Sequence, residues 1–180
     1  MFTDHSFSCM ISKNIKLILI YLGLLSGVTG DAILLKQEFF SIGLTSFLLG
    51  HVLYSISFLQ HKPKITPVSI LMFFSLSFGL NGYLIYSLYI HRSAMLIPVI
   101  LYIAAITFMA LLAFSLFKAD KQYRLLFIGA VLFYVSDFFL AIFHFINSII
   151  WLDIIILYTY YAAQTLIIIS TGKNFLTKES

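Results

Sequence analysis

Uninterrupted apolar stretches of about twenty residues recur along the whole chain. Because the hydrocarbon core of a bilayer is about 30 Å thick, a helix needs roughly 20 apolar residues to cross it. Hydropathy predicts six such helices, which cover residues 15–35, 39–60, 65–89, 94–117, 124–146 and 149–171. The connecting segments are short, so the sequence leaves little of the chain to lie outside a membrane.

The composition supports the same fold class. Of the 180 residues, 61% are hydrophobic and only 10% are charged, and the mean hydropathy is +1.02. Such a chain has too few polar side chains to cover a surface that faces water. Segments of alternating polarity, which a membrane β-barrel requires, are not visible. We therefore predict an all-α protein, a polytopic transmembrane helix bundle that forms one integral domain over residues 1–180.

The basic residues divide unequally between the two sides of this bundle. Six crossings place both termini on one side, together with nine of the basic residues: Lys13, Lys16, Lys62, Lys64, Lys118, Lys121, Arg124, Lys173 and Lys178. Only Lys36 and Arg92 fall on the other side. Since Lys and Arg accumulate in cytoplasmic loops, we expect a multi-pass protein with both termini in the cytoplasm, in the inner membrane if the source is a bacterium.

The amino-terminal segment lacks the basic start and the cleavage site of a secretory signal, so we expect the first helix to be retained. The net charge of +4 is best explained by contact with anionic membrane lipids. We do not expect nucleic acid as a partner, because no groove of interleaved basic and aromatic residues is apparent.

Two acids interrupt the apolar stretches and are the first candidates for chemistry. Asp137 lies near the middle of the predicted fifth helix, and Asp31 lies in the first. A carboxylate at this depth costs at least a few kcal/mol, so it is expected to face a partner, a cavity or a substrate. Gly27 and Gly30 accompany Asp31 at helical spacing, which favours close approach of another helix.

Further polar residues recur on other predicted helices. His51 and Tyr54 are three residues apart and share a face of the second helix. On the sixth helix Tyr160, Tyr161 and Gln164 form a polar patch. We expect Tyr161 and Gln164, which lie deeper than the interfacial Trp151, to orient a carboxyl group or a water. His144 is expected to be solvated near the outer boundary.

Familiar catalytic motifs are missing from the sequence. It has no nucleophile elbow, no paired zinc-ligand motif and no phosphate-binding loop. A serine mechanism is disfavoured because Ser136 and Asp137 are adjacent on a helix and point about 100° apart. Two carboxyl groups away from water form a better-defined system, in which one is protonated and the other ionised. Such a pair can exchange protons without a metal or cofactor.

Four segments of the chain resemble motifs of the YhhN family, in the family's order over roughly residues 20 to 170. They are Gly30-Asp31 with Leu34-Leu35, the stretch from Phe47 to Tyr54 that contains His51, the stretch from Gly129 to Asp137, and Tyr161 to Gln164. Members of that family usually have eight membrane helices. The first two of these eight helices have no counterpart among the six helices predicted here.

The YhhN family contains lysoplasmalogenases. The resemblance therefore implies a lysophospholipid substrate, a lysoplasmalogen, whose vinyl ether bond is hydrolysed to a fatty aldehyde and a glycerophospho-base. We hypothesise that Asp31 and Asp137 act as the catalytic acid and base in either order, as paired acids do in glycoside cleavage. The residues expected to position these acids or the water are His51, Tyr54, Tyr161 and Gln164.

Two alternatives remain open from the sequence. A metal-assisted lipid hydrolase would bind zinc through Asp31, His51, Asp137 and His144, a chemically allowed set of ligands that lacks paired spacing on any one helix. A small transporter or lipid-binding protein would use the intramembrane acids for proton coupling, but neither broken helices nor an internal repeat is evident.

Overall fold

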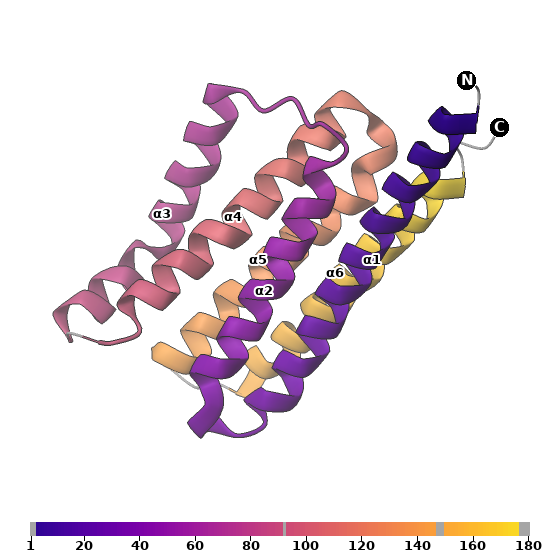
Figure 1. Cartoon of the computed structure of the whole chain (residues 1–180). Coiled ribbons are helices and arrows are strands. Elements are labelled where there is room, and N and C mark those ends of the chain that lie inside the picture. Colours follow the sequence, from indigo (N-terminus) through magenta and orange to yellow (C-terminus); the bar gives the residue numbers. More distant parts are fainter. Residues whose placement is uncertain (1–2, 92, 147–149, 177–180) are drawn as a thin grey trace.

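The computed structural model describes residues 3–91, 93–146 and 150–176. These residues form helices joined by short connectors (Figure 1). The long helices are α1 (Thr3–Leu34), α2 (Phe40–Leu59), α3 (Pro67–Ile90), α4 (Leu96–Ala119), α5 (Arg124–Phe145) and α6 (Ile150–Leu176). Two short 3-10 helices, η1 (Gln37–Phe39) and η2 (Lys121–Tyr123), precede α2 and α5. Within the described residues there is no strand, and six helices are long and apolar enough to span a membrane, which confirms the predicted fold class.

The observed helices differ most from the prediction at the two chain ends. The first helix begins at Thr3 instead of residue 15, although only Asn14–Leu34 is apolar enough to span a membrane. No Gly or Pro lies between residues 3 and 14, so extending an existing helix through them costs little. The last helix, α6, also runs past residue 171, through Gly172 to Leu176. Hydropathy marks the crossing and not the end of the helix.

The other predicted boundaries lie within a few residues of the observed ones. Thr66 caps α3, since its side chain accepts a hydrogen bond from the Ser69 amide, and Pro67 occupies the first turn. Pro98 similarly lies in the first turn of α4, where a missing amide hydrogen is tolerated. The predicted connector residues Arg92, Asn147 and Ser148, and the terminal Lys178, lie outside the described residues.

Five of the helices form a closed ring. Following the contacts around it, α1 packs on α2, α2 on α4, α4 on α5, α5 on α6, and α6 on α1. The peripheral helix α3 lies outside the ring against α4 and α5, and both chain ends lie together at one end of the bundle (Figure 1). Half of the spanning part of α2 and of α4 is buried, against 22% for α1, α3 and α6, so the core lies around α2 and α4.

Glycines allow α1 and α2 to approach each other closely. A Cβ atom built on Gly50 would lie 3.1 Å from the backbone oxygen of Gly23, and one built on Gly23 would lie 2.7 Å from the Tyr54 ring. Small residues at such contacts are the usual way in which membrane helices pack. The contact fixes the axial position of α1 relative to α2, and α2 carries His51 and Tyr54.

We predict that Gly50→Leu destabilises the protein by about 1–3 kcal/mol, because the new side chain forces the backbones of α1 and α2 apart. Gly79→Leu on α3 is the matched control, since a Cβ there meets nothing within 4 Å. Thermal unfolding in detergent measures both. Equal melting temperatures for the two variants would contradict the close packing of α1 on α2.

Candidate active site

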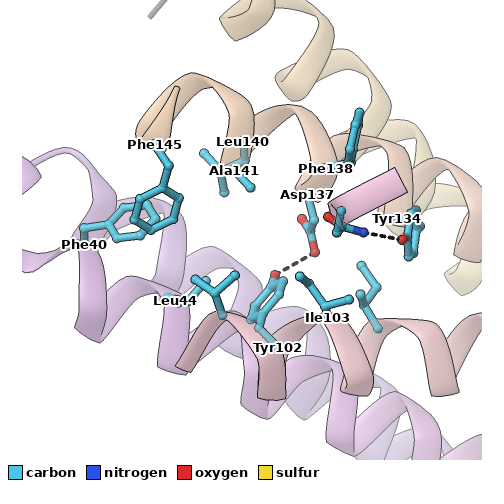
Figure 2. A pocket seen from close by; sticks show the side chains of 13 residues that line it. Phe40, Leu44, Tyr102, Ile103, Tyr134, Asp137, Phe138, Leu140, Ala141 and Phe145 are labelled. Carbon is cyan, nitrogen blue, oxygen red and sulfur yellow. Dashed lines mark hydrogen bonds between the residues drawn. The ribbon is translucent and has the colours of Figure 1, made fainter. Parts of the chain in front are cut away.

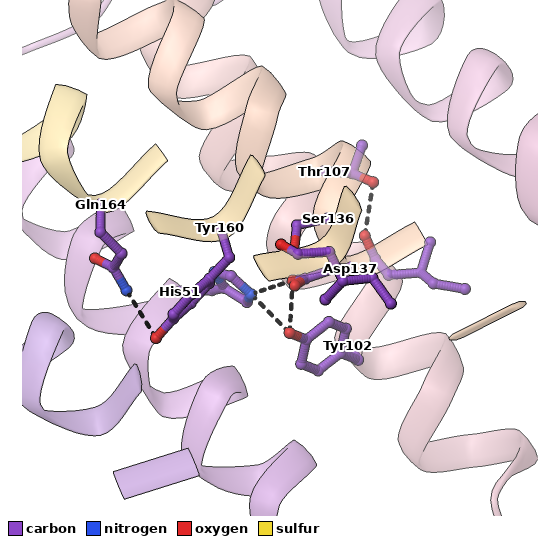
Figure 3. Close-up of polar contacts among 9 residues, drawn as sticks. His51, Tyr102, Thr107, Ser136, Asp137, Tyr160 and Gln164 are labelled. Atoms are coloured by element: carbon purple, nitrogen blue, oxygen red, sulfur yellow. Dashed lines mark hydrogen bonds and ion pairs between the residues drawn. The ribbon is translucent and has the colours of Figure 1, made fainter. Parts of the chain in front are cut away.

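A buried polar triangle joins three helices of the ring. The Tyr102 hydroxyl on α4 donates a hydrogen bond to Asp137 Oδ2 on α5 at 2.6 Å. His51 Nε2 on α2 lies 2.8 Å from the same carboxylate oxygen and 2.9 Å from the Tyr102 hydroxyl oxygen (Figure 3). All three side chains are buried. The triangle therefore gives the intramembrane carboxylate of Asp137 the partners that a charge at this depth requires.

The hydrogen bonds assign the histidine tautomer. Since Tyr102 donates its only hydroxyl hydrogen to Asp137, the second hydrogen bond to Oδ2 is donated by His51 Nε2. His51 Nδ1 is buried and has no hydrogen-bond partner among the described residues. A bare nitrogen is better tolerated there than an unpaired N–H, which agrees with the tautomer that carries its hydrogen on Nε2. His51 thus acts in this arrangement as a hydrogen-bond donor to Asp137.

A second polar chain leads to Asp31. The Tyr54 hydroxyl on α2 donates to Gln164 Oε1 on α6, and Gln164 Nε2 donates to the Tyr160 hydroxyl oxygen at 3.3 Å. Tyr160 in turn lies beside Asp31 on α1, and the two side chains interact electrostatically and line the same cavity. Gly27 makes room for this chain, because a Cβ there would lie 2.5 Å from the Tyr160 hydroxyl and 2.7 Å from Gln164 Nε2.

One aromatic ring separates the two polar groups. Phe133 on α5 packs edge-to-face against His51 of the triangle, with ring centroids 4.7 Å apart. It makes the same kind of contact with Tyr160 at 5.4 Å and with Tyr54 at 6.2 Å. Such contacts hold ring orientations in place, so Phe133 positions members of both groups at once.

Both acids border one cavity. Asp31 and Asp137 line a cavity of about 350 Å³, with apolar and aromatic side chains such as Phe40, Phe47 and Tyr160 making up much of the wall. The volume is within the range of small-molecule sites, about 300–1,000 Å³. The two carboxyl groups also interact electrostatically. The cavity thus offers two acids on separate helices to a single ligand.

Asp137 also lines a second, smaller cavity. This space of about 30 Å³ is lined by Tyr102 and Tyr134 as well as Asp137, and Phe40 and Phe145 lie toward one end of it (Figure 2). The Tyr134 hydroxyl accepts a hydrogen bond from Asn81 Nδ2 at 2.7 Å, which ties the peripheral helix α3 to α5. The carboxylate of Asp137 therefore lies in the wall between two spaces.

The structure brings five of the six predicted site residues into the two polar groups and leaves Tyr161 outside them. Asp31, His51, Tyr54, Asp137 and Gln164 belong to the two polar groups described above. Tyr161 lines the cavity but is 54% exposed, and its buried neighbour Tyr160, at 4%, makes the hydrogen bonds instead. Adjacent residues on a helix point about 100° apart, so only one of the two tyrosines can face the ring interior.

Other polar candidates take structural positions. His144 is exposed at the edge of the cavity and stacks on the Phe40 ring, with centroids 3.4 Å apart. The Ser136 hydroxyl donates to the backbone oxygen of Ile156 at 3.0 Å, a contact that packs α5 on α6. Within the described part of the chain, no group of three His, Cys, Asp or Glu side chains is arranged to hold a metal ion.

Sequence reasoning missed Tyr102. It lies in the long apolar stretch of α4, six residues after the helix begins at Leu96. A lone tyrosine at this position is typical of the aromatic belt at a membrane surface. Its depth, about 9 Å into the helix, is the one signal that indicated an interior role.

Comparison with known proteins identifies one family. The model of the YhhN family matches residues 9–171 of the chain. This range includes every residue of the triangle and of the polar chain that leads to Asp31. No solved structure matches the chain.

We predict that Tyr102→Phe lowers the stability of the protein by about 0.5–2 kcal/mol, the range found for buried hydrogen bonds between membrane helices. The substitution removes one donor from Asp137 and leaves the ring volume unchanged. Tyr86→Phe, at a tyrosine that is 60% exposed on α3, is the control. Reversible unfolding in detergent measures the difference, and indistinguishable variants would mean that the Tyr102 hydrogen bond contributes nothing.

Proposed function

Because the chain belongs to the YhhN family, we propose that it is a lysoplasmalogenase-type hydrolase, which cleaves the vinyl ether bond of a lysoplasmalogen. The observation that carries the proposal is the single cavity bordered by both intramembrane acids, Asp31 and Asp137. Its walls are largely apolar, as a site for a lipid chain requires. The products are a fatty aldehyde and a glycerophospho-base.

The reaction needs one proton donor and one proton acceptor. An acid protonates the β-carbon of the vinyl ether, and the resulting oxocarbenium ion is captured by water, which gives up a proton to a base. The hemiacetal then breaks its bond to the glycerol oxygen, which takes a proton as the aldehyde carbonyl forms. General acid and base catalysis by side chains typically contributes 10²–10⁴-fold to such steps.

The hydrogen bonds favour one division of these roles. Asp137 Oδ2 receives two hydrogen bonds, from Tyr102 and His51, which suits a carboxylate. Asp137 would then stabilise the cation and accept the proton of the attacking water. Asp31, which lies beside Tyr160 in the cavity wall, would donate the proton to the β-carbon. In this scheme Gln164 and Tyr54 position Asp31 by holding Tyr160.

We predict that Asp31→Asn and Asp137→Asn each lower aldehyde release by at least about 100-fold, because each removes one of the two proton-transfer groups. Asp120→Asn is the matched control: this residue caps η2 through its side-chain oxygen, away from the cavity, and asparagine can make the same hydrogen bond. Purified variants are incubated with a lysoplasmalogen, and the aldehyde is quantified. Melting temperatures check that the fold survives.

The matching ester lysophospholipid distinguishes reaction classes. An enzyme that works by protonating a vinyl ether carbon releases aldehyde from the ether lipid and no fatty acid from the ester. Fatty acid release would indicate an esterase, and full activity of either asparagine variant would rule out the acid pair.

Chelation separates the acid pair from a metal-assisted hydrolase. His51 and Asp137 are in direct contact, but no third ligand side chain joins them within the described residues. We therefore expect prolonged treatment with EDTA or phenanthroline to leave aldehyde release unchanged. Loss of activity that is restored by added zinc would favour the metal mechanism instead.

A further inference from the structure

We propose that the lipid enters the cavity sideways, between α1 and α6, from the membrane leaflet on the side away from the chain termini. The identity of the lipid rests on the function proposed above. The route rests on three independent features, which are the position of the cavity along the helices, the exposure of its rim, and the distribution of basic residues.

The cavity lies at the end of the bundle opposite the termini. Its lining includes Leu35, just after the end of α1, Phe40 at the start of α2, His144 in the last turn of α5, and Asp153 in the first turn of α6. Both termini and the connectors α2–α3 and α4–α5 lie at the other end (Figure 1). The cavity therefore occupies the half of the membrane that is remote from the termini.

The rim of the cavity is apolar and exposed where α1 and α6 separate. The two helices are close at Gly27, where a Cβ would strike Tyr160. Beyond it, toward the end of α1, the lining residues Leu35, Leu157 and Tyr161 are 86%, 50% and 54% exposed. In a bilayer these apolar side chains contact acyl chains, so the gap between α1 and α6 opens toward lipid instead of toward water alone.

The depth of the acids suits a lipid that enters from this leaflet. Asp31 lies three residues before the end of α1, or about 4.5 Å, and Asp137 lies eight residues before the end of α5, or about 12 Å. A single-chain phospholipid keeps its headgroup at the membrane surface and its first chain atoms just below it. The vinyl ether bond, next to the glycerol, then lies at the level of the two acids.

The basic residues identify the leaflet. Five basic residues lie in the connectors, or in the helix turns next to them, at the end that carries the termini: Lys62, Lys64, Lys118, Lys121 and Arg124. No Lys or Arg is among the described residues that line the cavity, whereas Asp31 and Asp153 are. By the positive-inside rule the end with the termini faces the cytoplasm. The site consequently takes its lipid from the non-cytoplasmic leaflet.

The test compares the side of activity with the orientation of the same molecules. In a Cys9→Ser background, Lys64→Cys and Glu38→Cys mark the two ends of the bundle at exposed positions. Each is reconstituted into vesicles, and an impermeant maleimide measures the fraction of each end that faces outward. Lysoplasmalogen is then added outside, and aldehyde release is followed before and after permeabilisation, over times too short for the lipid to cross the bilayer.

We expect the fraction of activity available before permeabilisation to equal the labelled fraction of Glu38→Cys, in preparations with different proportions of the two orientations. A fraction that follows Lys64→Cys, or that is independent of orientation, would overturn the proposed leaflet. Membranes of intact cells, labelled with the same reagent, test whether the Lys64 end faces the cytoplasm. Labelling of Lys64→Cys from outside intact cells would overturn the assignment to the non-cytoplasmic leaflet.

A second variant tests the gap itself. Leu157→Trp fills the rim between α1 and α6 and is expected to weaken binding of a saturated alkyl ether lysolipid, which has no vinyl bond to cleave. Leu76→Trp, at a leucine that is 62% exposed on α3, is the control. Equal binding by the two variants would overturn lateral entry. If the wild type binds the analogue but releases no aldehyde even after permeabilisation, the proposed function fails while the entry route is still measured.

Discussion

The burial of the Asp137 carboxylate constrains the rest of the structure. A charge in the interior of a membrane bundle is stable only when partners surround it, and here the partners come from two other helices, His51 on α2 and Tyr102 on α4. These contacts link α2, α4 and α5, which form the most buried side of the ring. The helices α1 and α6 complete the ring and bring Asp31 to the same cavity, with Phe133 packed between the two polar groups.

Much of this arrangement is readable from the sequence. The apolar stretches predict the number of helices, because the thickness of a bilayer leaves few alternatives for their length. The intramembrane acids Asp31 and Asp137 are recognisable because a carboxylate within an apolar span is energetically costly, so it is expected to face a partner, a cavity or a substrate. His51 and Tyr54 follow from their shared helix face. Membership of the YhhN family is likewise visible in short motifs around these residues.

The sequence does not determine which helices are neighbours, and the errors follow from this. Tyr102 resembles a residue of the aromatic belt until α4 is placed in the centre of the ring, where its hydroxyl meets Asp137. The choice between Tyr160 and Tyr161 depends on the rotation of α6 about its axis, which Gly27 on α1 fixes through the space it leaves. Hydropathy does not predict the long amino-terminal extension of α1, because the extension lies outside the apolar span.

Closure of the ring by its first and last helices has a consequence for biosynthesis. Asp31 is made 129 residues before Tyr160, its neighbour on α6. At roughly 5–20 residues per second, a ribosome needs on the order of ten seconds to cover that distance. During this interval α1 is in the membrane without α6, and of its two neighbours in the ring only α2 is present. The cavity bordered by Asp31 and Asp137 can therefore close only after α6, which forms part of its wall, has been made.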